Sequence, residues 1–181
     1  MMKSIAIRTL LGLCLAAAGT VASAASVVLV PTATTLGTNA SFSVNLDIDM
    51  SDVASAPYSG EVIITYDPAY LTYTGFTEAV SGTTATPTTG TAGSNNTVTV
   101  GFGNITFDAG TIGTYSFITN TLQGTTAISL ADANGLGSII ANVNEVFPSF
   151  TGTPVTIVPL PGAAWLMLSG LGVLGLTRRR A

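Results

Sequence analysis

The clearest pattern in the chain is a strict alternation of apolar and polar residues over positions 41–50. Successive side chains of a β-strand point to opposite faces, so one set enters a core and the other faces water. The apolar set is Phe42, Val44, Leu46, Ile48 and Met50, and the polar set is Ser41, Ser43, Asn45, Asp47 and Asp49. The alternation therefore predicts a half-buried strand.

Eight further short segments have the composition of strands. They are rich in Val, Ile, Thr and aromatic residues, and Gly, Pro, Asn and Asp separate them. The segments are 27–30, 61–66, 71–76, 97–102, 114–119, 127–130, 139–142 and 154–157. No long helical period occurs between them. The sequence thus predicts an all-β domain over residues 25–157, an antiparallel β-sandwich of about nine strands.

Residues 81–97 interrupt this pattern. The stretch holds seven Thr, three Gly and no charged residue. A polar, low-complexity sequence of this kind buries little apolar surface. We therefore expect a mobile loop or a poorly ordered connection between two strands.

Charge separates the middle of the chain from its ends. The five basic residues are Lys3, Arg8 and 178–180, whereas the nine acidic residues all lie from Asp47 to Glu145. Without a cationic side chain, the middle cannot offer phosphates a basic groove, so no nucleic-acid partner is expected. It also contains no His and no Cys, which excludes the usual catalytic triads, cysteine chemistry and common zinc sites.

Residues 1–24 have the organisation of a secretory signal peptide. Lys3 and Arg8 form a charged start, an apolar run over 10–19 follows, and Ala22 and Ala24 are the small residues that signal peptidase accepts. The run of about ten residues is too short to span a hydrocarbon core of roughly 30 Å. We expect signal peptidase to cleave near Ala25 and the remaining chain to be exported through the inner membrane.

The C-terminal segment, 158–181, has the features of a membrane stop. The apolar stretch 162–177 gives a helix of about 24 Å, which a thin or deformed bilayer accommodates. Basic residues after it stay on the cytoplasmic side, and two prolines before it leave an extended segment that a peptidase can reach. The short motif is Val158, Pro159, Leu160 and Pro161, and the basic cluster is Arg178, Arg179 and Arg180.

This tail resembles the PEP-CTERM sorting signal of Gram-negative bacteria. That signal combines a Val-Pro-Glu-Pro motif, an apolar helix often containing Ser-Gly-Leu, and terminal arginines. Residues 169–171 supply the Ser-Gly-Leu step, and Leu160 replaces the usual glutamate. The resemblance implies recognition by an exosortase, a membrane cysteine protease. It also implies removal of the tail and transfer of the domain to the cell surface or exopolysaccharide matrix. A permanent single-pass anchor is the alternative.

A second resemblance concerns residues 61–76, which read as a strand, a Tyr66-Asp67-Pro68 turn and a second strand. Pro68 fixes φ for the turn, and Asp67 can accept hydrogen bonds from the amides that follow. This unit, and the Ile-Gly-Thr-Tyr-Ser-Phe segment 112–117, resemble the corresponding parts of cohesin domains. The resemblance implies a jelly-roll sandwich, but it carries over no particular partner because such folds serve many unrelated surface proteins.

Candidate chemistry is limited to carboxylates. A glycosidase needs two of them across a cleft, but Asp47 and Asp49 are expected on a solvated strand face. Asp108 and Asp132 are expected in loops, and no activating residue lies near them in the sequence. We therefore expect no catalytic residue and no enzymatic activity.

Calcium is the one cofactor that the sequence brings into consideration. Asp132 and Asn134 occupy the first and third positions of an EF-hand-like loop. Leu136 and Val143 stand at the fifth and twelfth positions, where ligands are required. An Asp/Asn/Gly turn between strands is the favoured interpretation, with calcium at Asp132 and Asn134 as a secondary one. No other metal or cofactor is expected.

Two functions follow from these observations. The first is an exported, non-catalytic binding or structural module of the cell surface or matrix, with exopolysaccharide or another surface protein as its partner. The alternative is a secreted carbohydrate-binding or carbohydrate-active protein that uses surface carboxylates. The middle of the chain contains no Trp, which disfavours a sugar-binding platform and favours the first function.

Overall fold

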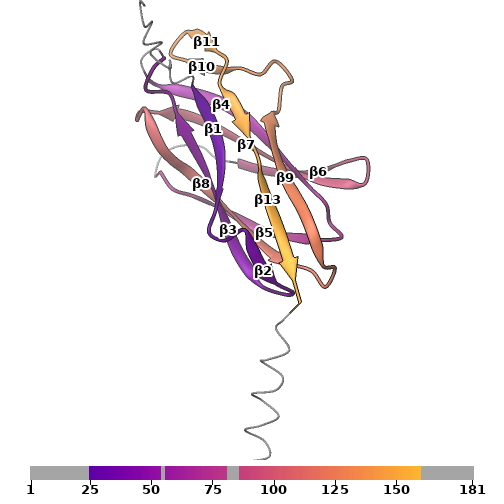
Figure 1. Ribbon diagram of the computed structural model, residues 1–181. Coiled ribbons are helices and arrows are strands. Elements are labelled where there is room, and N and C mark those ends of the chain that lie inside the picture. The colour runs from indigo at the N-terminus through magenta and orange to yellow at the C-terminus, as the bar shows by residue number, and fades with distance from the viewer. Residues whose placement is uncertain (1–24, 54–55, 81–85, 160–181) are drawn as a thin grey trace, which may run out of the picture.

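The domain is built from strands alone. The computed structural model describes residues 25–53, 56–80 and 86–159, and within these ranges it contains 13 strands and no helix (Figure 1). The strands are β1 (Ser26–Pro31), β2 (Thr35–Gly37), β3 (Ser41–Asp49), β4 (Tyr58–Tyr66), β5 (Leu71–Glu78), β6 (Thr86–Ala92), β7 (Asn95–Ile105), β8 (Ala109–Thr119), β9 (Gly124–Asp132), β10 (Ile139–Ala141), β11 (Asn144–Val146), β12 (Ser149–Thr151) and β13 (Thr153–Val158). The predicted all-β class is confirmed.

The strands form two sheets that pack against each other. The first sheet has the order β12-β1-β3-β8-β5, and the second contains β11-β10-β4-β9-β13-β2 with β7 and β6 added beside β4. Neighbouring strands are antiparallel except for the β1–β12 and β13–β2 pairs. The chain passes from the first sheet to the second at Gly152, where a Cβ would overlap the carbonyl oxygen of Ile128 on β9.

The core lies between the two inward faces. The alternation predicted over 41–50 is confirmed, because the apolar set from Phe42 to Met50 is buried. Phe117 on β8 lies at the centre of an aromatic cluster, with ring centroids 5.6 Å from Phe42, 5.3 Å from Tyr66 and 5.8 Å from Tyr73. Such edge-to-face and stacked pairs add to the stabilisation that burial supplies.

Two tyrosines of the core, Tyr58 and Tyr115, have raised pKa values. Tyr58 is fully buried and donates a hydrogen bond of 2.8 Å to Asp108 Oδ1. Burial, followed by this bond and the charge of Asp108, raises the pKa of Tyr58 to about 12. Burial also raises the pKa of Tyr115, whose hydroxyl has no hydrogen-bond partner in the described part of the chain.

The turn at the end of β4 has the predicted geometry. β4 ends at Tyr66 and β5 begins at Leu71. Asp67 Oδ1 accepts a hydrogen bond of 2.8 Å from the amide of Ala69, and the carbonyl oxygen of Asp67 accepts one from the amide of Leu71. The Asp side chain therefore fixes the reversal between the sheets, as the sequence indicated.

The expectation of a loop over 81–97 is wrong for most of that stretch. Residues 86–92 form β6, which pairs with β7 along its whole length, and residues 81–85 lie outside the described residues. β6 is an edge strand that adds no buried apolar residue to the core. Backbone hydrogen bonds hold it, so its sequence needs no apolar alternation.

The predicted targeting segments fall largely outside the described residues. These are the signal peptide 1–24 with Ala22 and Ala24, Leu160 and Pro161 of the motif, the apolar stretch 162–177, and Arg178, Arg179 and Arg180. Val158 is the last residue of β13, and Pro159 follows it. Between residues 25 and 159, the described part of the chain has no helix long and apolar enough to cross a membrane.

Gly113 on β8 provides a test of the core packing. A Cβ at Gly113 would overlap the ring of Phe76, whereas a Cβ at Gly75 on β5 would meet nothing within 4 Å. We expect Gly113→Ala to lower the free energy of unfolding by about 1–3 kcal/mol through overpacking. Gly75→Ala, the matched control, should change it by less than about 1 kcal/mol. Denaturant unfolding measures both, and equal effects would contradict this packing.

Candidate binding surfaces

The outer face of the second sheet is nearly free of charge. We call it the hydroxyl face and define it by Glu61, Ile63, Thr65, Thr99, Gly101, Ser129 and Ala131, which alternate with buried residues on β4, β7 and β9, together with Thr97, which lies in the same row but is buried. The strand register places Ile63 between Ala131 and Thr99. It places Thr65 between Ser129 and Thr97. The three strands thus present one continuous surface.

The composition of the hydroxyl face suits contact with another macromolecule. Glu61 is its single charged residue, and most other side chains are small. Burying such a surface removes few charges from water. On a charged face, removing charges from water is the main free-energy cost of forming an interface. The threonine and serine hydroxyls can donate and accept hydrogen bonds at the same time. The face can therefore bind a partner, and its one titratable group is the Glu61 carboxylate.

The outer face of the first sheet differs because its polar side chains bond to one another. Thr111 donates a hydrogen bond of 2.6 Å to Asp47 Oδ1, and Thr114 donates one of 3.0 Å to Asn45 Oδ1. Ser51 donates to Asp49 Oδ1 through its hydroxyl and its amide, and these bonds lower the pKa of Asp49. Asp47 and Asp49 lie on the outward face, as predicted: Asp47 accepts a cross-strand hydrogen bond, and Asp49 holds the turn that follows β3.

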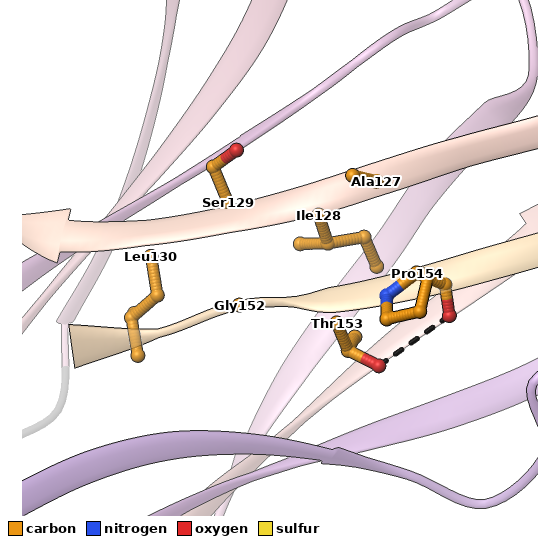
Figure 2. Close-up of a pocket in the computed structure, with 7 residues that line it drawn as sticks. All are labelled: Ala127, Ile128, Ser129, Leu130, Gly152, Thr153 and Pro154. Atoms are coloured by element: carbon orange, nitrogen blue, oxygen red, sulfur yellow. Dashed lines mark hydrogen bonds between the residues drawn. The ribbon is translucent and has the colours of Figure 1, made fainter.

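A shallow hollow of about 400 Å³ lies where the chain enters β13 (Figure 2). Its walls come from β9 and from the start of β13: Ala127, Ile128, Ser129, Leu130, Gly152, Thr153 and Pro154. The one hydrogen bond drawn among them joins the Thr153 hydroxyl to the Pro154 carbonyl oxygen. The hollow contains no titratable side chain, so it supplies no acid or base.

Asp132, a calcium candidate, organises the loop that follows β9. It is the last residue of β9 and is buried, with Oδ2 accepting hydrogen bonds of 2.8 Å from the Leu136 amide and 3.0 Å from the Gly137 amide. Gly135 and Gly137 adopt φ values of 72° and 71°. This is the Asp/Asn/Gly turn that the sequence favoured, since the carboxylate bonds its own loop.

The second calcium candidate, Asn134, is exposed at the tip of the same loop. Oδ1 of Asp132 is buried and has no hydrogen-bond partner among the described residues. Within these residues no group of three or more His, Cys, Asp or Glu side chains could hold a metal ion. The turn is thus observed through Asp132 Oδ2, and calcium at Asp132 and Asn134 stays a prediction.

Asp108 and Asp132 each have a structural role. Asp108 accepts the hydrogen bond from buried Tyr58, and Asp132 accepts those of its loop amides. A catalytic pair would need one carboxyl group free to move a proton.

The residues that sequence reasoning missed are those of the hydroxyl face. The alternation of Glu61, Ile63 and Thr65 on β4 was the available signal, but assembling the face requires the strand register.

No protein-family model matches the sequence, and no curated protein matches it. Solved structures do. The type I cohesin of OlpA from Clostridium thermocellum, solved with a dockerin, superposes with a TM-score of 0.58 at 12% identity, covering 75% of this chain and 99% of that chain. A cohesin module of a family 33 glycoside hydrolase from Clostridium perfringens gives 0.57 at 11% identity, covering 76% and 97%.

The seventh ScaB type I cohesin from Pseudobacteroides cellulosolvens is similar to the same extent, with a TM-score of 0.56 at 10% identity over 76% of this chain and 94% of that chain. Each of these cohesins is matched over nearly its whole length. At such low sequence identity, the shared feature is the arrangement of the strands in space. The described domain therefore has the cohesin fold.

Proposed function

We propose that this chain is an exported, non-catalytic module of the cell surface or exopolysaccharide matrix that binds a protein partner through the hydroxyl face. The observation that carries the proposal is a cohesin fold with one outer face nearly free of charge. One of the similar structures is a cohesin–dockerin complex, so the fold is compatible with protein recognition. Because the strands are already held in a sheet, binding a partner through them costs little conformational entropy.

Export and sorting form the second part of the proposal. Val158 ends the last strand, and Pro159 follows directly. A cut near the motif would therefore leave the sandwich intact. We propose that signal peptidase removes residues 1–24, that an exosortase recognises the segment beginning at Val158, and that the domain is then released to the surface or matrix of a Gram-negative bacterium.

The described residues offer the carbohydrate alternative no exposed Tyr or Trp, and Phe147 is their one strongly exposed aromatic side chain. Tyr58, Tyr66 and Tyr115 are buried in the core. Tyr70 and Tyr73 are partly buried and pack against it, and the described ranges contain no Trp. Because sugar rings bind by stacking on exposed aromatic faces, these positions favour a protein partner over a glycan.

Retention at the cell surface tests the hydroxyl face. We expect Thr99→Arg to raise the fraction of exported protein found free in the medium by about tenfold, since it places a bulky charge in the centre of the interface. Thr77→Arg, on an exposed position of β5 in the other sheet, is the matched control and should be retained like the unaltered protein. Immunoblots of surface and medium fractions give the ratio. Equal retention of both variants would contradict the proposal, and retention on purified exopolysaccharide alone would favour the carbohydrate alternative.

Intact-mass measurement of the surface-released protein tests the processing. We expect a product that begins near Ala25 and lacks Trp165, the only tryptophan of the chain. Replacing Pro159 and Pro161 with Ala should cause unprocessed protein to accumulate in the membrane fraction, because the extended segment before the helix is lost. A surface product that retains Trp165 would show permanent anchoring instead.

A further inference from the structure

One end of the sandwich gathers the loops around β10 and β11. The register places the end of β3 beside the start of β8 at Asp49 and Ala109. It also places the start of β4 beside the end of β7 and beside β10. Figure 1 shows β10 and β11 at the top of the molecule, while β13 runs to the opposite end, where the last described residues lie. We call the upper region the β10–β11 end.

The β10–β11 end exposes four large apolar side chains within one short segment. Their exposed fractions are 67% for Leu136, 43% for Ile140, 83% for Val143 and 66% for Phe147. The other exposed large apolar residues of the described ranges are Val30, Ile118 and Leu122, at 42%, 36% and 45%. Single exposed apolar residues are ordinary. A group of four at one end, including the three most exposed in the described domain, is typical of an interaction surface.

The fold itself does not need these four side chains to be apolar. Ile139, Ala141 and Val146 are the residues of this hairpin that reach the core, and they hold it in place. Asn142, with a φ of 58°, makes the turn that leaves Val143 at the tip. Polar residues at the exposed positions would preserve the hairpin, and their exposure to water would cost less free energy. The fold therefore does not account for their apolar character.

Several carboxylates lie at the same end of the sandwich as this apolar group. Asp49 and Asp52 lie at and after the end of β3, Asp108 lies between β7 and β8, and Glu145 lies on β11. Asp67, after β4, is the acidic residue at the opposite end, and the described residues include no basic side chain. A second copy of the chain would bring the same negative charges to the contact, and an anionic bilayer would also be repelled. A cationic partner would be attracted.

We propose that the β10–β11 end is a docking surface for a cationic, apolar segment of a partner protein, in which apolar side chains cover Val143 and Phe147 and flanking Lys or Arg residues face the carboxylates. Ile140 on β10 pairs with Ser59 of β4 and so borders the hydroxyl face, whereas Val143 and Phe147 flank β11, at the end of the sandwich opposite the last residues of β13. The domain can therefore hold one partner on the hydroxyl face and another around β11.

A synthetic amphipathic peptide of Leu and Lys is the probe for this surface. We expect it to bind the exported protein, recovered from an expressing Gram-negative host, with an affinity that falls as salt is added. A peptide with Glu in place of Lys and one with Ser in place of Leu should each bind at least about tenfold more weakly. Fluorescence anisotropy of the labelled peptides measures all three. Equal binding of the Glu peptide would overturn the proposal.

Exposed-residue variants locate the binding site without disturbing the core. The double variant Val143→Ser with Phe147→Ser should weaken binding of the Leu/Lys peptide by at least about tenfold, because both side chains lose their apolar contact. Val30→Ser with Leu122→Ser, exposed elsewhere, is the matched control and should leave it unchanged, as should Thr99→Arg. Loss of binding in either control would overturn the proposal. Two other results would also overturn it: self-association of the protein, or its binding to anionic vesicles, if either is lost in the Val143→Ser, Phe147→Ser variant.

Discussion

The structure depends on burying one apolar face of each sheet against the other. The described domain has no helix, no disulfide and no basic side chain, so no ion pair supports it. Alternating residues on β3, β4, β7 and β8 supply the buried surface, and the rings around Phe117 fill its centre. Successive residues of a strand point to opposite sides of the sheet. When one set of alternating residues is buried in the core, the other set is therefore the one that the outer face presents to solvent.

The two outer faces present different kinds of side chains to solvent. On the first sheet, Asp47 and Asn45 are bonded to threonines of the neighbouring strand, so polar groups there satisfy one another. On the second sheet, Ile63, Thr65 and Thr99 belong to a surface that contains one carboxylate, Glu61. The remaining acidic residues lie mainly toward the β10–β11 end, where apolar side chains are exposed among them. Charge and apolar surface are therefore distributed unevenly over the sandwich.

Sequence reasoning identified the parts of the fold that depend on local pattern. Nine strands and the turn at Asp67 were predictable because alternation and turn chemistry depend on residues that are adjacent in the sequence. β2, β6, β11 and β12 were missed. Three of them have only three residues each, and β6 is held by backbone pairing to β7 with little burial. The hydroxyl face was not predictable either, because its members come from three strands whose register only the folded chain defines.

The most direct test of the central claim is photo-crosslinking on living cells, with a photoreactive amino acid placed at Thr99 or, for comparison, at Thr77. If the hydroxyl face holds a protein partner, the Thr99 position will give a discrete protein adduct by mass spectrometry and the Thr77 position will give none. Polysaccharide adducts at Thr99, or the same adducts from both positions, would contradict the account.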